Sequence, residues 1–426
     1  MAQIGSYLGP GIMSRGAGDI GNRSGSAVDL RYYIDANAVY DNGIQPFAVD
    51  SKGNLVTING LYGVQLDFGA YGVHTWRQAT LGLDFSGNFY HYDNASQYDG
   101  STENLMLGYT YQKSRRLSFD LRQSAGTSSL GYGGPGFYSL GSSSGSLVGQ
   151  PTSLLFDNRI YYAQSTADMT FIQTPRTFYT IGGDGILVRR SASGLAGTNG
   201  WDARGTIQHR LSKARTIGVE YEYLHFEFPP AFGNSNSNLA QLFLAQGLGK
   251  NWNFSVHAGA FQTNTVGLQQ VALSPVVAAL LGTSVGIQRF NRTDIYPSGQ
   301  ATLSGRMKNS NLTFGYSQTV VPGNGVYLTS RQSSATAGYS YTGIRKWNLG
   351  VSGGYYTLGS IGQGIPTYVQ FSAGAGATYS LSRSFHIVAR YDARHQDINL
   401  AGYRRTGYRA TFGIAFSPGN VPLSLW

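Results

Sequence analysis

Seven histidines carry the most reactive side chains of a chain that has no cysteine. Two of them precede an aspartate by two residues, His91 with Asp93 and His395 with Asp397, a pairing that general acid–base catalysis can use. Such pairs are common by chance, and the histidines lack the spacing of a metal site. The glycine-rich stretch 182–185 lacks the strand–turn–helix setting of a phosphate-binding loop. We therefore expect no enzyme activity, no catalytic residue, no cofactor and no bound metal.

Charged side chains are the other groups that can take part in function, and their placement matters more than the net charge of +10. They make up 12% of the chain, about half of their usual share in soluble domains. The basic residues do not alternate with aromatic residues on one patch. We therefore expect no nucleic-acid partner.

The elements that position these charges are strands, because apolar residues alternate with small or polar residues at a period of two, repeatedly from Val28 to Phe416. In the first stretch Leu30 and Ile34 fall on one face and Arg31 falls on the other. The same pattern recurs along the chain and gives 18 strands, with an error of about two. No apolar stretch is long enough for a transmembrane helix. The sequence therefore predicts an all-β fold, an antiparallel up-and-down transmembrane β-barrel.

Connections between these strands alternate in length, which predicts a barrel with both termini on the side of the short turns. The facing of the strand near Leu242 stays open. The short turns are 76–78, 113–116, 174–176, 212–215, 249–251, 308–311, 343–346 and 382–384. The longer connections are 41–58, 92–102, 125–157, 190–198, 229–238, 264–292, 321–332, 358–366 and 397–404.

Over residues 28–416 the chain resembles a bacterial outer-membrane β-barrel of the porin type. The resemblance rests on the alternating strands, on the asymmetry of the connections, and on a last strand that ends in Phe416. It implies the bacterial cell outer membrane as location, outer-membrane lipid as surroundings, and insertion by the barrel-assembly machinery. The alternative is a soluble all-β fold, such as a sandwich, a propeller or an extracellular β-helix. The outer face of a soluble barrel or sandwich would be rich in Lys and Glu, which is not the case here, and a propeller would repeat a motif about every 40 to 50 residues.

Two segments flank this predicted barrel. Residues 1–27 are glycine-rich and without alternation, and we expect a strap or a plug there. Residues 417–426 form a tail after Phe416, so that either Phe416 or Trp426 is the end that the assembly machinery reads. We expect an exported protein in which Met1 replaces a removed signal peptide.

The predicted inward positions carry charges of both signs, nearly in balance. Arginines of the last two strands and the first strand become neighbours on closure, and Glu220 with Glu222 lies about half the circumference away. This predicts an arginine wall that faces carboxylates across the lumen, unless each arginine pairs locally. The predicted pore-lining residues are Arg31, Arg122, Arg204, Arg390, Arg394, Arg405, Arg409, Asp67, Asp84, Asp120, Glu220 and Glu222.

The short turns and their flanks hold twelve basic residues and no acidic residue. In the predicted fold they form a ring at the periplasmic rim, which we call the basic ring. It anchors the barrel to lipid phosphates or concentrates anionic solutes at the exit. Its members are Arg77, Lys113, Arg115, Arg116, Arg176, Lys213, Arg215, Lys250, Lys308, Arg345, Lys346 and Arg383.

Two long connections stand out. The connection 125–157 either stays outside or folds inward, in which case Tyr132, Phe137 and Tyr138 line a constriction. The connection 264–292 contains an apolar segment between Ser274 and Gly282, typical of a short helix. We expect that helix to bury itself in the lumen, against a neighbour or in a partner.

The sequence thus predicts a channel for passive diffusion of small hydrophilic solutes. The main alternative is a non-conducting barrel that acts as a surface scaffold or docking partner in an envelope complex. A secretion channel for an exported polymer is a third possibility. A homo-oligomer and an envelope-protein partner are both compatible with the sequence.

Overall fold

The computed structural model describes residues 29–42, 48–49, 55–56, 60–93, 99–129, 159–191, 195–229, 231–323, 325–362, 367–398 and 403–417. These residues form a closed antiparallel sheet of 18 strands, which confirms the predicted barrel and its strand number. A two-stranded pair, β2 (Ala48–Val49) and β3 (Leu55–Val56), and a helix, α1 (Pro275–Leu281), lie outside this sheet. The barrel strands are β1 (Asp29–Asn42), β4 (Leu61–Thr75), β5 (Ala79–Tyr92), β6 (Gly100–Gln112), β7 (Leu117–Ser129), β8 (Arg159–Ile172), β9 (Thr177–Arg190), β10 (Thr198–Arg210), β11 (Arg215–Glu227), β12 (Gly233–Leu248), β13 (Trp252–Ala272), β14 (Val285–Arg306), β15 (Ser310–Val321), β16 (Ser330–Tyr341), β17 (Trp347–Ser360), β18 (Tyr368–Ser380), β19 (Phe385–Ile398) and β20 (Tyr403–Phe416).

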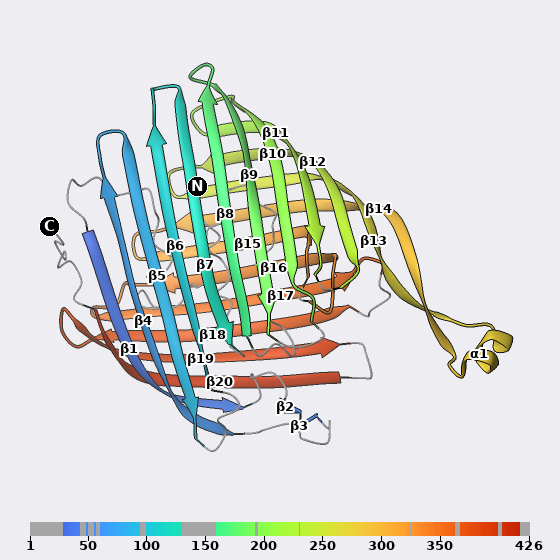
Figure 1. Ribbon diagram of the computed structural model, residues 1–426. Coiled ribbons are helices and arrows are strands. Elements are labelled where there is room, and N and C mark those ends of the chain that lie inside the picture. Colours follow the sequence, from blue (N-terminus) through green and yellow to red (C-terminus); the bar gives the residue numbers. More distant parts are fainter. Residues whose placement is uncertain are drawn as a thin grey trace.

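The sheet closes where β1 pairs with both β4 and β20 (Figure 1). At this seam Ala38 lies opposite Val64 on one side and opposite Phe412 on the other. All other strands pair with their neighbours in sequence. Closure satisfies the backbone groups of both edges, which a sheet needs in order to cross a membrane.

Exposure of the side chains follows the predicted alternation. Ile34 is 46% exposed on the outer face, whereas the next residue, Asp35, is 2% exposed on the inner face. Leu242 in β12 is 65% exposed, which settles the facing of that strand. Gly69 gives room for an interior ring, because a Cβ atom there would lie 2.5 Å from Cε1 of Tyr33. A belt of exposed apolar side chains thus surrounds the barrel, while polar side chains such as Asp35 face its interior.

Short turns join the strands at one end of the barrel and longer connections join them at the other. We call these the turn end and the loop end. β1 begins and β20 ends at the turn end, as predicted. Some boundaries differ from the prediction: β15 already begins at Ser310, and β12 begins at Gly233.

The prediction that 264–292 forms a loop is wrong for most of its length. β13 continues to Ala272, β14 resumes at Val285, and these two residues still pair. Outward apolar residues such as Leu268 and Ile287 lie there among exposed polar residues, so the regular apolar alternation that identifies a membrane strand is interrupted. The paired strands form an arm that extends beyond the barrel at the loop end (Figure 1).

The short helix predicted in this segment is present as α1, at the tip of the arm. Ala278 donates its backbone N–H to the carbonyl of Ser274 at 2.8 Å, and Gly282 ends the helix with a φ of 67°. Val276 is 71% exposed and Leu280 is 81% exposed. Of the three surroundings expected for this helix, the lumen is wrong, because the arm carries α1 away from the barrel, and contact with a neighbour or a partner stays a prediction.

No helix in the described residues is long and apolar enough to cross a membrane. Three predicted segments lie outside the described residues: 1–27, the connection 125–157 from residue 130 onward, and the tail beyond Ser417. The constriction residues Tyr132, Phe137 and Tyr138 fall in this group.

Candidate functional site: the charged interior of the barrel

A buried arginine and three aspartates occupy the interior face of β8, β9 and β10. The guanidinium of Arg204 pairs with the carboxylate of Asp184, lies 2.7 Å from Oδ1 of Asp168, and lies 3.3 Å from Oδ1 of Asp202. The Arg204 side chain is 3% exposed. In the register Arg204 lies opposite Gly182, whose lack of a side chain leaves room for the Asp168 carboxylate. We call these four residues the Arg204 cluster.

Two glutamates of β11 extend this negative region. Glu220 accepts a hydrogen bond from Nε2 of Gln241 at 2.9 Å. Glu222 lies opposite Arg204 in the register and is fully buried. Neither carboxylate oxygen of Glu222 has a hydrogen-bond partner among the described residues. Together with the Arg204 cluster, the glutamates place five carboxylates beside one arginine.

An arginine-rich region lies on β19 and β20. Nε of Arg390 lies 2.5 Å from Oδ2 of Asp392 on the same strand. Arg409 donates to Oε1 of Gln65, and Gln65 in turn donates to Oδ1 of Asp67 at 2.6 Å. This chain of contacts links β20 to β4 across β1.

The Asp67 carboxylate also accepts from Nδ2 of Asn37 on β1 at 3.2 Å. Arg394 and Arg405 lie on the same inner face of β19 and β20, by alternation with Arg390 and Arg409. Side chains from all three strands of the seam therefore meet in one polar network around Asp67.

Other predicted pore-lining residues lie between these two regions. Nε of Arg122 lies 2.8 Å from Oδ1 of Asp120 on β7, and Asp84 is 2% exposed on β5. Arg31 lies opposite Tyr71 in the register of β1 and β4, and its side chain is outside the described set.

The arginine region of β19 and β20 and the glutamates of β11 lie about half of the strand order apart. Local pairs form as well, because Arg122, Arg204 and Arg390 each contact an aspartate. A role of these residues in a pore stays a prediction.

An apolar layer on the loop-end side of the Arg204 cluster was missed by the sequence reasoning. The inward positions of β11 run from Glu220 and Glu222 to Leu224 and Phe226, both of which are fully buried. The sequence alternation already indicates that these two residues point inward. They were not predicted to form an apolar layer because the interior of such a barrel was expected to be polar. The layer is a single buried cluster of Ile160, Ile186, Val188, Ala196, Leu224, Phe226, Phe228, Leu239, Phe261, Val320 and Ile361.

Residues of distant loop-end connections take part in this apolar layer. The connection between β9 and β10 contributes Ala196, and the connection after β17 contributes Ile361. The backbone N–H of Ala196 donates to the carbonyl of Gly325, in the connection between β15 and β16, at 3.1 Å. Contacts between connections that are far apart in the strand order narrow the loop end of the barrel.

The basic ring lies at the turn end, with its members exposed. Arg215 is the first residue of β11, and its Nε donates to Oε1 of Gln246 at 3.2 Å. Lys346 has a φ of 69°, and its Nζ lies 5.9 Å from the ring centroid of Tyr379. Arg77, Arg115, Arg116, Lys213 and Arg345 lie in the turns themselves.

The two histidine pairs singled out in the sequence have other neighbours in the structure. Nδ1 of His91 lies 2.6 Å from Oδ2 of Asp99, and Nδ1 of His395 lies 2.7 Å from Oγ1 of Thr406. Asp397 pairs instead with Arg404. Within the described ranges, no group of three His, Asp or Glu side chains is placed to hold a metal ion.

No protein-family model matches the sequence, and no curated protein matches it. Among solved structures, the barrel is similar to the ferric citrate transporter FecA in its unliganded form, with 10% identity and a TM-score of 0.46 over 90% of this chain. It covers 63% of that chain, and so spans less than two thirds of FecA.

The barrel is also similar to Pseudomonas aeruginosa OccK2 (OpdF) in complex with glucuronate, with 11% identity and a TM-score of 0.43. The match covers 91% of this chain and 98% of that one. The outer membrane protein opdK of Pseudomonas aeruginosa gives 11% identity, a TM-score of 0.42, and coverage of 91% and 99%. The architecture of an outer-membrane barrel follows from this chain's own strands, connections and apolar belt.

Proposed function

We propose that the chain is an outer-membrane channel through which small hydrophilic solutes diffuse passively. The observation that carries this proposal is the division of the two faces of a closed 18-stranded barrel: the outer face is apolar and the inner face holds charged and hydrogen-bonded side chains. At this strand number the interior is wide enough for water unless it is filled.

The charges of the interior set the selectivity of the proposed channel. The five carboxylates beside Arg204 favour the cationic end of a solute, whereas the arginines of β19 and β20 favour its anionic end. A solute that carries both charges would be oriented between these regions. The apolar layer narrows its path at the loop end.

Single-channel current in a planar bilayer tests this proposal. The detergent-purified protein is measured under a salt gradient, and its fold is checked by heat-modifiable mobility on a gel. Steady current steps with a defined reversal potential are expected. The variant Arg405→Ala/Arg409→Ala should shift that potential toward cations, because it removes two interior positive charges. A folded barrel that gives no current would contradict the channel.

The arm of β13 and β14 favours a second function, a surface scaffold or docking partner. It carries α1 beyond the barrel, and Ile287 and Ile295 on the arm are each 74% exposed. These exposed apolar side chains are the candidate contact points for a partner. A folded barrel that gives no current in the bilayer would support this second function, and the next experiment would then look for partners that bind the arm.

A further inference from the structure

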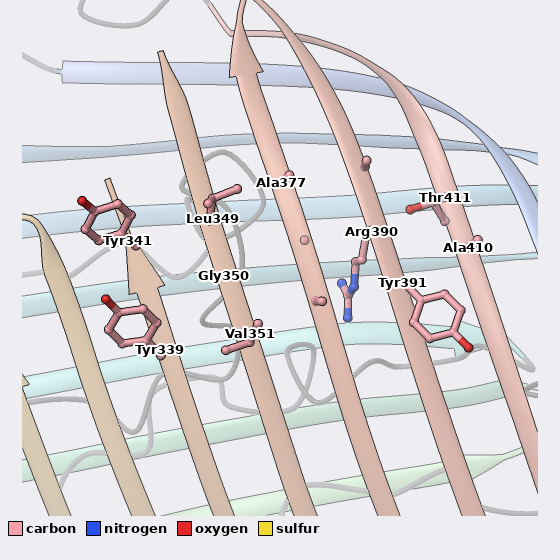
Figure 2. A pocket seen from close by; sticks show the side chains of 13 residues that line it. Tyr339, Tyr341, Leu349, Gly350, Val351, Ala377, Arg390, Tyr391, Ala410 and Thr411 are labelled. Carbon is pink, nitrogen blue, oxygen red and sulfur yellow. The ribbon is translucent and has the colours of Figure 1, made fainter. Parts of the chain in front are cut away.

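The outer wall of the barrel is hollowed over β16 to β20. This groove is open, has a volume of about 770 Å³, and lies on the outer face, where the side chains of Tyr339, Val351 and Tyr391 are exposed. Figure 2 shows the rings of Tyr339 and Tyr341 on one side of it and the ring of Tyr391 on the other. Alanines of β18, β19 and β20 form much of its floor.

The groove results from rows of large and small residues that the register aligns. One row crosses the wall from Leu349 to Ala377 and on to Ala389. The next row passes from Val351 through Ala375 to Tyr391. Because the alanines of β18, together with Ala389 and Ala410 on the next two strands, lie among bulky side chains, the wall is recessed there. A recess in the apolar belt must be filled by hydrocarbon to recover the dispersion contacts that it lacks.

The groove lies in the half of the wall next to the turn end. Tyr341 is the last residue of β16, and Ala377 lies three residues before the end of β18. From Ala375 to Tyr379 the strand rises about 13 Å. One leaflet supplies about 15 Å, half of a hydrocarbon core of roughly 30 Å. The groove therefore matches one leaflet, the one at the turn end.

Cations of the basic ring lie at the end of this groove. Nζ of Lys346 lies 5.9 Å from the ring centroid of Tyr379, which follows Ala377 on the outward face of β18. The ring of Trp347 lies 5.0 Å from the same tyrosine ring. Arg345 and Arg383 are exposed in the two adjacent turns. Apolar wall, aromatic rim and cations thus follow one another in the order of acyl chain, glycerol and phosphate in a lipid.

We propose that this groove binds one phospholipid of the leaflet at the turn end. One acyl chain lies along the alanine floor between Tyr341 and Tyr391, and the phosphate is bound by Arg345, Lys346 and Arg383. The charge at the end of the groove distinguishes this occupant from a second copy of the chain, since the turn regions of another copy carry the same positive charge. The site depends on the membrane placement in the proposed function but not on conduction.

A photoactivatable phosphatidylglycerol with a diazirine in its acyl chain tests the site. The full-length protein is reconstituted with this probe and irradiated, and the labelled peptides are identified by mass spectrometry. Labelling should concentrate on residues 339–391. Two variants should each lose it: Ala377→Phe/Ala389→Phe, which fills the groove, and Arg345→Gln/Lys346→Gln/Arg383→Gln, which removes the cations. Ala167→Phe, on the exposed face of β8 outside the groove, should label like the wild type.

Three results would overturn the site. Labelling that spreads evenly around the barrel, or that persists in the groove-filling variant, means bulk lipid only. Efficient disulfide cross-linking of two chains through Ala377→Cys means that a second copy occupies the groove. If the groove-filling variant does not fold, the glutamine variant decides, because its substitutions lie in exposed turns. A barrel that binds the probe but passes no current would refute the channel and leave the lipid site standing.

Discussion

Arg204 is the residue on which the interior charges of β8 to β10 depend. Its guanidinium contacts Asp168, Asp184 and Asp202, and the Asp184 and Asp202 side chains have no exposed surface. A buried carboxylate that loses its cation is costly, because protein cannot replace the lost water. One guanidinium group therefore compensates three aspartate carboxyl groups.

Arg204→Gln should lower the free energy of unfolding by about 3–5 kcal/mol, the range for breaking a buried pair. The measurement is the urea midpoint at which the heat-modifiable folded band disappears. Arg122→Gln is the matched control: its partner Asp120 lies at 2.8 Å, but both side chains are about a third exposed. That pair should contribute less than about 1 kcal/mol. Equal losses in the two variants would show that burial of the Arg204 cluster has no energetic role.

The apolar layer lies at the loop-end ends of the strands and has two effects on the secondary-structure elements. It packs β9, β11, β12 and β13 against loop-end connections, and it narrows the interior there. Phe226 and Phe261 are fully buried members.

Phe226→Ala should lower the free energy of unfolding by about 3–5 kcal/mol and raise the single-channel conductance. Both effects follow from removing a ring that fills interior space. Phe412→Ala is the control, since its side chain is 60% exposed on the outer face and fills no interior space. Conductance that stays unchanged in Phe226→Ala would mean that the solute path does not pass this layer.

The tip of the arm of β13 and β14 should be separable from the barrel. Replacing residues 271–286 with Asn-Gly joins Gln270 to Ile287, which already lie opposite each other, through a two-residue turn. The shortened protein should keep the heat-modifiable mobility and the conductance of the full chain. Loss of the folded band would show instead that the tip of the arm supports the barrel.

The strands could be predicted from the sequence because each one crosses the membrane belt and repeats the same alternation. The arm could not, since beyond the belt polar residues such as Gln262 and Asn264 interrupt the outward apolar positions of β13. Side-chain partners were equally hidden. Arg409 contacts Gln65 although 344 positions separate them, and only closure of the barrel brings them together. The apolar layer was not predicted for another reason. The general rule that barrel interiors are polar was applied to every inward residue.

At the scale of the whole molecule, the pairing of β1 with β20 at the seam closes the sheet into a barrel. A Cβ atom at Gly413 would collide with the carbonyl oxygen of Ala36 and with the side chain of Asn37 on the facing strand. Gly413→Val should therefore prevent closure and abolish the heat-modifiable form. Ile414→Val, at the next position and 55% exposed outside, should fold like the wild type. A normally folded Gly413→Val protein would contradict the packing at the seam.

The same seam has a kinetic consequence. Ile34 pairs with Phe416, so the contact that closes the barrel joins two ends of nearly the whole described chain. Contacts at such separation are slow, because the entropy of loop closure is lost before the pairing energy is gained. Until then β1 and β20 are open edges that can pair with other chains. We expect the rate of refolding to be set by this single late event, and its yield to fall as the protein concentration rises.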